Sequence, residues 1–452
     1  MKALFGTDGI RGEAGRFPLD DPTVSIIGFA LARYLKELVG RPATIIIGRD
    51  TRESGEWIER ALTQGAVAAN AACRSAGVIT TPGVAFLTRA LEADAGIVIS
   101  ASHNPYYDNG IKIFAPSGRK LDDSIERRIE ADIRGEAKQT VPDPDNLRLS
   151  SLDDEALLRN RYLEFLGNEI GKGLSLRDLS IVIDCANGAS SDLAPSLFAR
   201  LGARVIAINY QPNGRNINEN CGSLHIESLQ QRVLAEKADL GIAFDGDADR
   251  SLFVDHNGNF VDGDATLWVL ANHMQGTGEL KNDVVVATVM SNIGLEIALR
   301  SRGLRLVRTD VGDKYVLEEL LRLGATLGGE QSGHIIFPQL SLAGDGMITS
   351  LLLLRALDQR AKSLAEMTAG FERYPQILLN VPVREKRAFS EILPLQKMVK
   401  ETEKKLSDKG RLLLRYSGTE SLARIMIEGE KQSEIEVYAR DIARTIQQAI
   451  GL

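Results

Sequence analysis

Short runs of apolar and β-branched residues alternate with segments of helical spacing along most of the chain. Five such runs lie at residues 44–48, 96–100, 181–184, 205–208 and 284–287. Each run is bounded by glycine or by a charged loop, which is typical of parallel strands that helices cover on both faces. A helical pattern begins at Ser54, directly after the first run. This alternation predicts α/β units with buried sheets.

The last part of the chain has a different pattern. After Pro375 the sequence reads ILLNVPV, then a charged helical segment, then LLLRYSGTE and RIMIEG, and the tail from 432 to 450 has helical spacing. Because 452 residues are too many for one hydrophobic core, we predict several domains. The predicted domains are three α/β domains at 1–150, 151–252 and 253–370 and an α+β domain at 371–452. An Asp-, Pro- and Ser-rich stretch at 134–155 is the predicted first linker, and the hairpin-like VDHNGNFVDGD opens the third domain.

The composition is that of an ordinary globular protein, with 44% hydrophobic and 25% charged residues and a formal net charge of -7. A net negative charge gives no sign of the basic surface that nucleic-acid binding requires. The three cysteines are an odd and widely spaced set, which fits neither a disulfide framework nor a zinc site but suits a reducing compartment. No signal peptide opens the sequence, and the most apolar stretch, at 347–354, is too short to span a bilayer. We therefore expect a soluble cytoplasmic protein that binds neither nucleic acid nor membrane.

Polar groups collect after several predicted strands, where α/β sheets present their ligands. The first such loop is ISASHNPYYDNGIKIF, residues 99–114, which contains Ser102, His103 and Lys112. A serine hydroxyl is a weak nucleophile and needs a base, a metal or a stable phosphorylated form. Taken alone, Ser102 is equally consistent with a residue that caps a turn.

The second loop, FDGDADRSLFVD, carries Asp245, Asp247 and Asp249 and is followed by Arg250. Alternate residues of an extended loop point the same way, so the three carboxylates are predicted to converge. Their mutual repulsion favours a bound cation, and hard oxygen ligands suit Mg²⁺. The alternative is a solvated acidic turn.

Two further loops carry candidate substrate contacts. In GGEQSGH, residues 328–334, Glu330 and Ser332 can bind vicinal hydroxyls and His334 can exchange protons, although a turn with a buried histidine explains the same residues. The loop RYSGTESLAR supplies donors for a phosphate, namely Arg415, Ser417, Gly418, Thr419 and Arg424. Here the alternative is a glycine turn with helix-capping Ser and Thr. No Walker A pattern and no GxGxxG follows a strand, so a donor other than a nucleotide is expected.

At these four loops the sequence resembles the α-D-phosphohexomutase superfamily, over essentially the whole chain. The resemblance implies an α/β fold of four domains around a central cleft, three related α/β domains with mixed sheets plus a C-terminal α+β domain. It implies that Ser102 is the phosphoserine and that its phosphoryl group joins the three aspartates in holding one Mg²⁺. Glu330, Ser332 and Arg250 would bind the sugar, and the loop from Arg415 to Arg424 would hold the phosphate that is not reacting. An activating kinase or autophosphorylation would load Ser102, and members are monomers or homodimers.

Within the superfamily, further motifs are similar to those of the bacterial phosphoglucosamine mutases. They are FGTDGIRG with Thr7, Asp8 and Arg11, NINENCGSLH (216–225), VGDKYV (311–316) and GGEQSGH. Relatives of other specificity commonly have Met at the position of Gln331, and many have Gly at the position of Ala248. This resemblance implies that glucosamine 6-phosphate and glucosamine 1-phosphate are interconverted through glucosamine 1,6-bisphosphate, on the route to UDP-N-acetylglucosamine and cell-wall precursors.

The transfer requires a base for the sugar hydroxyl. Lys112 is the first candidate, with Arg11, Arg49, His103 and His334 as helpers that the sequence does not rank. Three other functions remain open: a mutase for glucose or mannose phosphates, a metal-dependent phosphatase, and a sugar-phosphate-binding protein without turnover.

Overall fold

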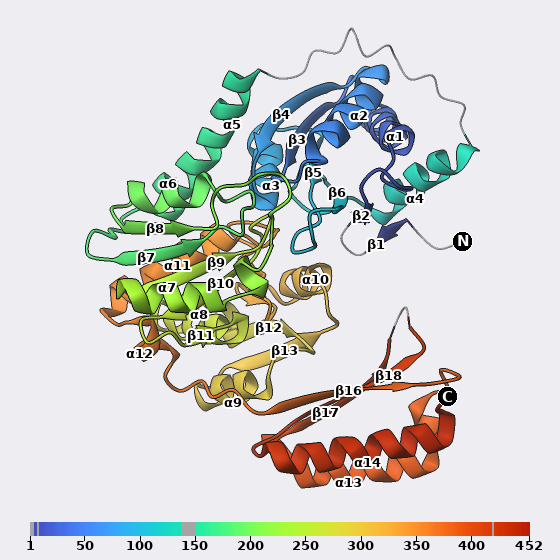
Figure 1. Ribbon diagram of the computed structural model, residues 1–452, viewed down its shortest axis with the longest axis vertical. Helices are drawn as coiled ribbons and strands as arrows, with labels where there is room; N and C mark the ends of the chain where they lie inside the picture. The colour runs from blue at the N-terminus through green and yellow to red at the C-terminus, as the bar shows by residue number, and fades with distance from the viewer. Residues whose placement is uncertain (1–3, 7–8, 137–150, 418–419) are drawn as a thin grey trace. The chain divides into compact units, whose positions relative to one another are not determined.

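The computed structural model describes residues 4–6, 9–136, 151–417 and 420–452. The chain folds into two compact units, one of residues 1–289 and 308–368 and the other of residues 290–307 and 369–452. Three mixed sheets and one antiparallel sheet are present, which confirms the prediction of α/β domains followed by an α+β domain. Figure 1 shows the order of these elements along the chain.

The first sheet has the strand order β1-β2-β6-β5-β3-β4. Its strands are β1 (Phe5–Gly6), β2 (Gly9–Glu13), β3 (Thr44–Arg49), β4 (Ala72–Val78), β5 (Ala95–Ile99) and β6 (Asp108–Phe114). β3 pairs in parallel with β4 and β5, and β6 and β2 extend the sheet in antiparallel fashion. The helices of this part are α1 (Asp21–Val39), α2 (Gly55–Ala68), α3 (Thr81–Ala90) and α4 (Asp123–Ala131). Their apolar faces and the centre of the sheet form one core, because the side chains of β3 and β5 are mostly buried.

The second sheet has the order β11-β10-β9-β7-β8. Its strands are β7 (Ser180–Asp184), β8 (Arg204–Ile208), β9 (Leu240–Phe244), β10 (Ser251–Asp255) and β11 (Phe260–Val261), and its helices are α5 (Leu152–Glu164), α6 (Leu193–Arg200) and α7 (Glu227–Glu236). The predicted hairpin is present, but β10 pairs with β9, so both hairpin strands belong to this sheet and do not open the third domain. The predicted boundary between residues 252 and 253 therefore cuts β10, since sheet pairing and not the turn decides where the domain ends.

The third sheet has the order β13-β12-β14-β15. Its strands are β12 (Val284–Thr288), β13 (Arg305–Thr309), β14 (Gly328–Gly329) and β15 (Ile335–Ile336), and its helices are α8 (Gly263–Thr277), α9 (Ile293–Ser301), α10 (Asp313–Leu323), α11 (Gly346–Arg360) and α12 (Leu364–Thr368). The fourth sheet has the order β16-β18-β17, from β16 (Gln376–Pro382), β17 (Arg411–Tyr416) and β18 (Leu422–Glu428). Helices α13 (Leu393–Leu406) and α14 (Gln432–Ile450) lie side by side on one face of this last sheet (Figure 1).

Secondary structure agrees with the hydrophobic pattern where that pattern is strong. All five predicted strands exist within one residue of their expected bounds, and α14 spans the predicted tail helix. The predicted linker at 134–155 lies partly outside the described residues. Its described ends join helices, since a π-helical turn continues α4 to Glu136 and α5 begins at Leu152. In the part of the chain that the structure describes, no helix has both the length and the hydropathy to cross a membrane.

A buried carboxylate caps α11 and ties it to α5. Asp345 Oδ1 accepts hydrogen bonds from the backbone N–H groups of Met347 (2.9 Å) and Ile348 (3.1 Å). The hydroxyl of Tyr162 donates to Asp345 Oδ2 at 2.7 Å. Burial outweighs these hydrogen bonds and raises the pKa of Asp345 from 3.8 to about 6.

We expect Asp345→Asn to remove a pH dependence of stability. A carboxyl group whose pKa is higher in the folded protein stabilises the fold below its unfolded pKa, and this contribution is lost as pH rises through the folded pKa. Relative to the variant, the wild-type protein should lose up to about 3 kcal/mol of unfolding free energy between pH 4 and pH 7. Thermal melts of both proteins across this range measure the effect. A difference in melting temperature that stays constant with pH would contradict the assignment.

Candidate active site

Ser102 lies at the end of β5, in a turn that holds its backbone in the left-handed region with φ of +52°. Its side chain is buried, and its backbone N–H donates to Ser100 Oγ at 2.9 Å. Ser102 Oγ donates to Asp245 Oδ2 at 2.7 Å and lies 3.3 Å from Nδ1 of His103. A non-glycine residue with this φ is uncommon, so the turn aims the hydroxyl at Asp245 at some cost in backbone energy.

The three aspartates after β9 do converge, but by a route other than the predicted extended loop. One oxygen from each of Asp245, Asp247 and Asp249 lies within 4.8 Å of the other two. The chain between them forms a turn, in which Ala248 N–H donates to the carbonyl of Asp245 at 3.0 Å. Ala248 has φ of +54°, a region that glycine enters without steric cost. Glycine would therefore suit this position, and alanine adopts the same conformation at some cost in backbone energy.

The aspartate cluster has the properties of a cation site. Asp247 Oδ1 and Asp249 Oδ1 are buried and accept no hydrogen bond within the described residues. Burial, followed by the charges of Asp249 and Asp247, raises the pKa of Asp245 well above its usual value. A hard divalent cation would satisfy these oxygens and remove the repulsion, so the residues present fit a metal of this kind.

The opposite carboxylate oxygens are already engaged. Lys112 Nζ, on β6, donates to Asp247 Oδ2 at 2.8 Å and lies 3.6 Å from Asp249 Oδ2. The hydroxyl of Thr81, at the start of α3, donates to the same oxygen of Asp247 at 2.6 Å. The sequence reasoning missed Thr81, whose only signal is its place after a strand of the first sheet. Lys112 is therefore an ion-pair partner of the aspartates.

A cavity of about 580 Å³ opens beside the aspartates. The predicted site residues that line it are Arg11, His103, Asp249, Arg250, Glu330 and His334. Burial, and then the charges of Arg250 and Arg11, lower the pKa of His103 to about 4. Burial alone would lower the pKa of His334, but the carboxylates of Asp249, Asp313 and Glu330 raise it to about 9. The cavity thus shifts the pKa values of its two histidines in opposite directions.

The loop between β14 and β15 closes another side of this cavity. Glu330 Oε1 accepts a hydrogen bond from the backbone N–H of Gly312 at 3.1 Å, which orients the carboxylate. The hydroxyl of Ser332 is buried and has no hydrogen-bond partner within the described residues. His334 Nε2 accepts from the backbone N–H of Gly344 at 3.2 Å, which directs its other nitrogen to Asp249.

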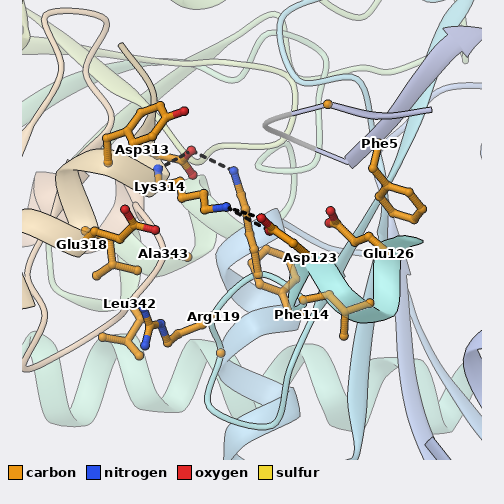
Figure 2. Close-up of a pocket in the computed structure, with 16 residues that line it drawn as sticks. Phe5, Phe114, Arg119, Asp123, Glu126, Asp313, Lys314, Glu318, Leu342 and Ala343 are labelled. Atoms are coloured by element: carbon orange, nitrogen blue, oxygen red, sulfur yellow. Dashed lines mark hydrogen bonds and ion pairs between the residues drawn. The ribbon is translucent and has the colours of Figure 1, made fainter. Parts of the chain in front are cut away.

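A second cavity, of about 450 Å³, lies on the other side of Asp313 and is lined by Phe5, Phe114 and the start of α10 (Figure 2). Two ion pairs cross it, from Lys120 to Asp313 (2.8 Å) and from Lys314 to Asp123 (2.9 Å). The other carboxylate oxygen of Asp313 lies 3.9 Å from His334 Nε2. Asp313 thus lines both cavities, and it belongs to the motif VGDKYV.

The phosphate-loop residues belong to the second unit. Arg415 on β17 and Arg424 on β18 are cross-strand neighbours, which places two guanidinium groups on one face of the sheet. Arg424 Nη2 donates to Ser417 Oγ (3.3 Å) and to Glu420 Oε2 (3.0 Å). Like charges directly opposite each other are destabilising, so this pair suits an anionic ligand. Gly418 and Thr419, like Thr7 and Asp8 of the N-terminal motif, lie outside the described residues.

Comparisons with known proteins cover the whole chain. Family models described as phosphoglucomutase/phosphomannomutase match in four parts: alpha/beta/alpha domain I at residues 2–140, domain II at 160–258, domain III at 262–374 and the C-terminal domain at 378–445. A phosphoglucosamine mutase of Solibacter usitatus is 49% identical over 451 residues, which are 100% of this chain and 99% of the relative.

Solved structures share the fold. A phosphoglucomutase/phosphomannomutase family protein from Burkholderia thailandensis has a TM-score of 0.79 at 21% identity, covering 100% of this chain and 99% of the other. The N-acetylphosphoglucosamine mutase of Aspergillus fumigatus, crystallised with GlcNAc-6P and magnesium, has a TM-score of 0.64 at 18% identity, covering 99% and 96%.

Proposed function

Because this chain belongs to the bacterial phosphoglucosamine mutases of the phosphohexomutase superfamily, we propose that Ser102 carries the phosphoryl group that the reaction transfers. The chain is an isomerase that interconverts hexosamine phosphates. The observation that carries the proposal is the 2.7 Å hydrogen bond from Ser102 Oγ to Asp245, since it places a strained, buried serine against the cation site.

Two transfers accomplish the isomerisation. In the first, the C1 hydroxyl of glucosamine 6-phosphate attacks the phosphorus on Ser102, the bond from phosphorus to Oγ breaks, and the hydroxyl proton passes to a base. In the second, Ser102 Oγ attacks the 6-phosphate of glucosamine 1,6-bisphosphate, the bond from phosphorus to the C6 oxygen breaks, and this oxygen takes up the proton that the base holds. Positioning and charge stabilisation supply most of the catalysis in transfers of this kind.

Asp245, Asp247 and Asp249 would hold one Mg²⁺, together with an oxygen of the phosphoryl group on Ser102. The buried oxygens of Asp247 and Asp249 that accept no hydrogen bond within the described residues support this ligand set, as does the magnesium in the Aspergillus fumigatus protein. A bound Mg²⁺ neutralises charge on the transferring phosphoryl group. Lys112, which like Mg²⁺ is positively charged, lies against the carboxylates of Asp247 and Asp249.

His103 is the better placed of the candidate bases. It lies 3.3 Å from Ser102 Oγ, lines the cavity, and has a pKa lowered to about 4, so its neutral ring can accept a proton. Lys112 is paired with two carboxylates, and the guanidinium of Arg11 lines the cavity. His334, with a pKa raised to about 9, is suited to donate a proton or to neutralise charge.

The remaining residues recognise the substrate. Glu330 and Ser332 would bind sugar hydroxyls and Arg250 a charged group, which is supported by the places of Glu330 and Arg250 in the cavity lining and of Ser332 in the same loop as Glu330. Arg415, Ser417, Gly418, Thr419 and Arg424 would bind the phosphate that is not reacting. We further propose a cytoplasmic location, which the three free cysteines support, priming of Ser102 by a kinase or by autophosphorylation, and a monomer or homodimer.

Coupled assays with three sugar 6-phosphates test the substrate. A site built to bind a polar group discriminates strongly against an analogue that lacks it, so we expect kcat/KM for glucosamine 6-phosphate to exceed those for glucose and mannose 6-phosphates by about 100-fold or more. Equal or greater kcat/KM with a 2-hydroxy sugar would point to the other mutase specificity. Release of inorganic phosphate as the main product would point to a phosphatase.

A further inference from the structure

Two side chains outside the cavity hold the turn that carries Ser102. Arg52 Nη2 donates to the carbonyl oxygens of Ser102 (3.2 Å) and Asn104 (2.6 Å). Asn218 Nδ2 donates to the same two oxygens, at 2.9 Å and 3.1 Å. Each carbonyl is therefore bound twice, by two side chains that come from different parts of the chain.

Both donors are themselves fixed. Arg52 follows β3, its side chain is fully buried, and its guanidinium forms an ion pair with Asp50. Asn218 lies in the loop after β8, within the motif NINENCGSLH, and its backbone N–H donates to the carbonyl of Ala186 at 2.9 Å. In the same loop, the carbonyl of Gly214 accepts a hydrogen bond at 3.0 Å from the N–H of Glu53, which lies between β3 and α2.

The turn that brings the aspartates together packs onto the same carbonyl. A Cβ atom at Gly246 would lie 2.5 Å from the carbonyl oxygen of Ser102 and 2.9 Å from Asn218 Nδ2, so only glycine fits between Asp245 and Asp247. The Ser102 carbonyl is thus the point where the segment after β3, the loop after β8 and the aspartate turn meet.

We infer that Arg52 and Asn218 are positioning residues, which lock the Ser102 turn so that Oγ faces the aspartates in line for transfer. This inference rests on the proposed role of Ser102. With φ of +52° the turn is strained, and the two donors offset that strain by binding its carbonyls only in this conformation. If one donor is lost, the turn can relax and Oγ moves relative to Asp245.

The kinetic signature of such a role is specific. Arg52 and Asn218 touch backbone atoms of the Ser102 turn, and neither is among the described residues that line the cavity. Substrate binding should therefore be preserved while the transfer step is slowed. A displacement of about 1 Å from the productive geometry is enough to cost roughly 100-fold in rate.

Asn218→Gly is the test variant, because it removes the amide without adding strain to a residue that has φ of +58°. We expect kcat to fall by about 10- to 100-fold while KM stays within about threefold. Asn282→Gly is the matched control. Asn282 has φ of +61°, and its Nδ2 likewise bridges two carbonyls, those of Leu323 (2.9 Å) and Gly324 (3.5 Å), away from the cavity.

Asn218→Asp is a second variant that keeps the shape but places an acceptor against two carbonyl oxygens, and its kcat should fall at least as far. The inference fails if both Asn218 variants keep a kcat within about threefold of Asn282→Gly, or if the loss appears in KM instead. The intact mass of the wild-type protein tests the carrier role of Ser102 separately from the positioning role of Asn218. If the wild-type protein never carries phosphate on Ser102, the proposed function itself is wrong, whatever the variants do.

Discussion

Replacing Ser102 by alanine is expected to abolish turnover, with kcat reduced by about 10⁴-fold or more, because a covalent carrier cannot be replaced by neighbouring groups. Ser102 Oγ is the atom that faces Asp245, and alanine removes it with little change in volume. Intact-mass measurement before and after incubation with glucosamine 6-phosphate should find one phosphoryl group on the wild-type protein and none on Ser102→Ala. Substrate binding should persist, since the cavity is lined by other residues.

Ser25→Ala is the matched control for this experiment. Ser25 is also a buried serine, but it lies on α1 within the core of the first sheet. Its replacement should leave both turnover and the phosphorylated mass unchanged. Retention of more than a few per cent of wild-type turnover by Ser102→Ala, or a phosphoryl group that maps to another residue, would refute the carrier role.

Replacing Asp245 by asparagine is expected to have opposite effects on activity and on stability. Activity should fall by about 100- to 1000-fold, because a metal site that loses a carboxylate ligand stabilises the transferring phosphoryl group less well. The metal-free variant should nevertheless melt at a higher temperature than the metal-free wild type. Burial and two neighbouring carboxylates raise the pKa of Asp245, so its charge destabilises the fold when no cation is present.

Metal binding can be followed without any assay of turnover. Chelation should lower the melting temperature and activity of the wild-type protein, and added Mg²⁺ should restore both, whereas Asp245→Asn should respond weakly to Mg²⁺ in calorimetry and in thermal melts. Asp192→Asn is the control, since Asp192 is an exposed carboxylate at the start of α6. An Mg²⁺-dependent rise in melting temperature that is equal in wild type and Asp245→Asn would exclude the aspartate cluster as the metal site.

The Ser102 turn and the aspartate turn show how the site depends on long-range contacts. Each turn contains a non-glycine residue with positive φ, Ser102 in one and Ala248 in the other. Neither conformation is favoured locally, so each persists because atoms distant in sequence bind or pack against it. Asn218 and Gly246 supply two of these contacts to Ser102.

The sequence alone determined five strands, the hairpin, the tail helix and the chemical class of each loop. Strands such as β3 and β7 are recognisable because a buried parallel strand must be apolar on both faces, so its consecutive residues are mostly apolar. The three aspartates, the serine and the cluster of phosphate-loop donors indicated a mutase because each chemistry requires its own residue types. The resemblance to the phosphohexomutases depended on the same four loops.

Only the tertiary structure decided which groups meet and in which charge state. It placed β10 and β11 in the second sheet, because strand pairing depends on a partner that the hairpin itself does not contain. It paired Lys112 with Asp247 and moved the pKa of His103 and that of His334 in opposite directions, because burial and neighbouring charges are set by residues far along the chain. It also revealed Arg52 and Asn218 around the Ser102 carbonyls, since a side chain that binds another residue's backbone leaves no periodic signal in the sequence.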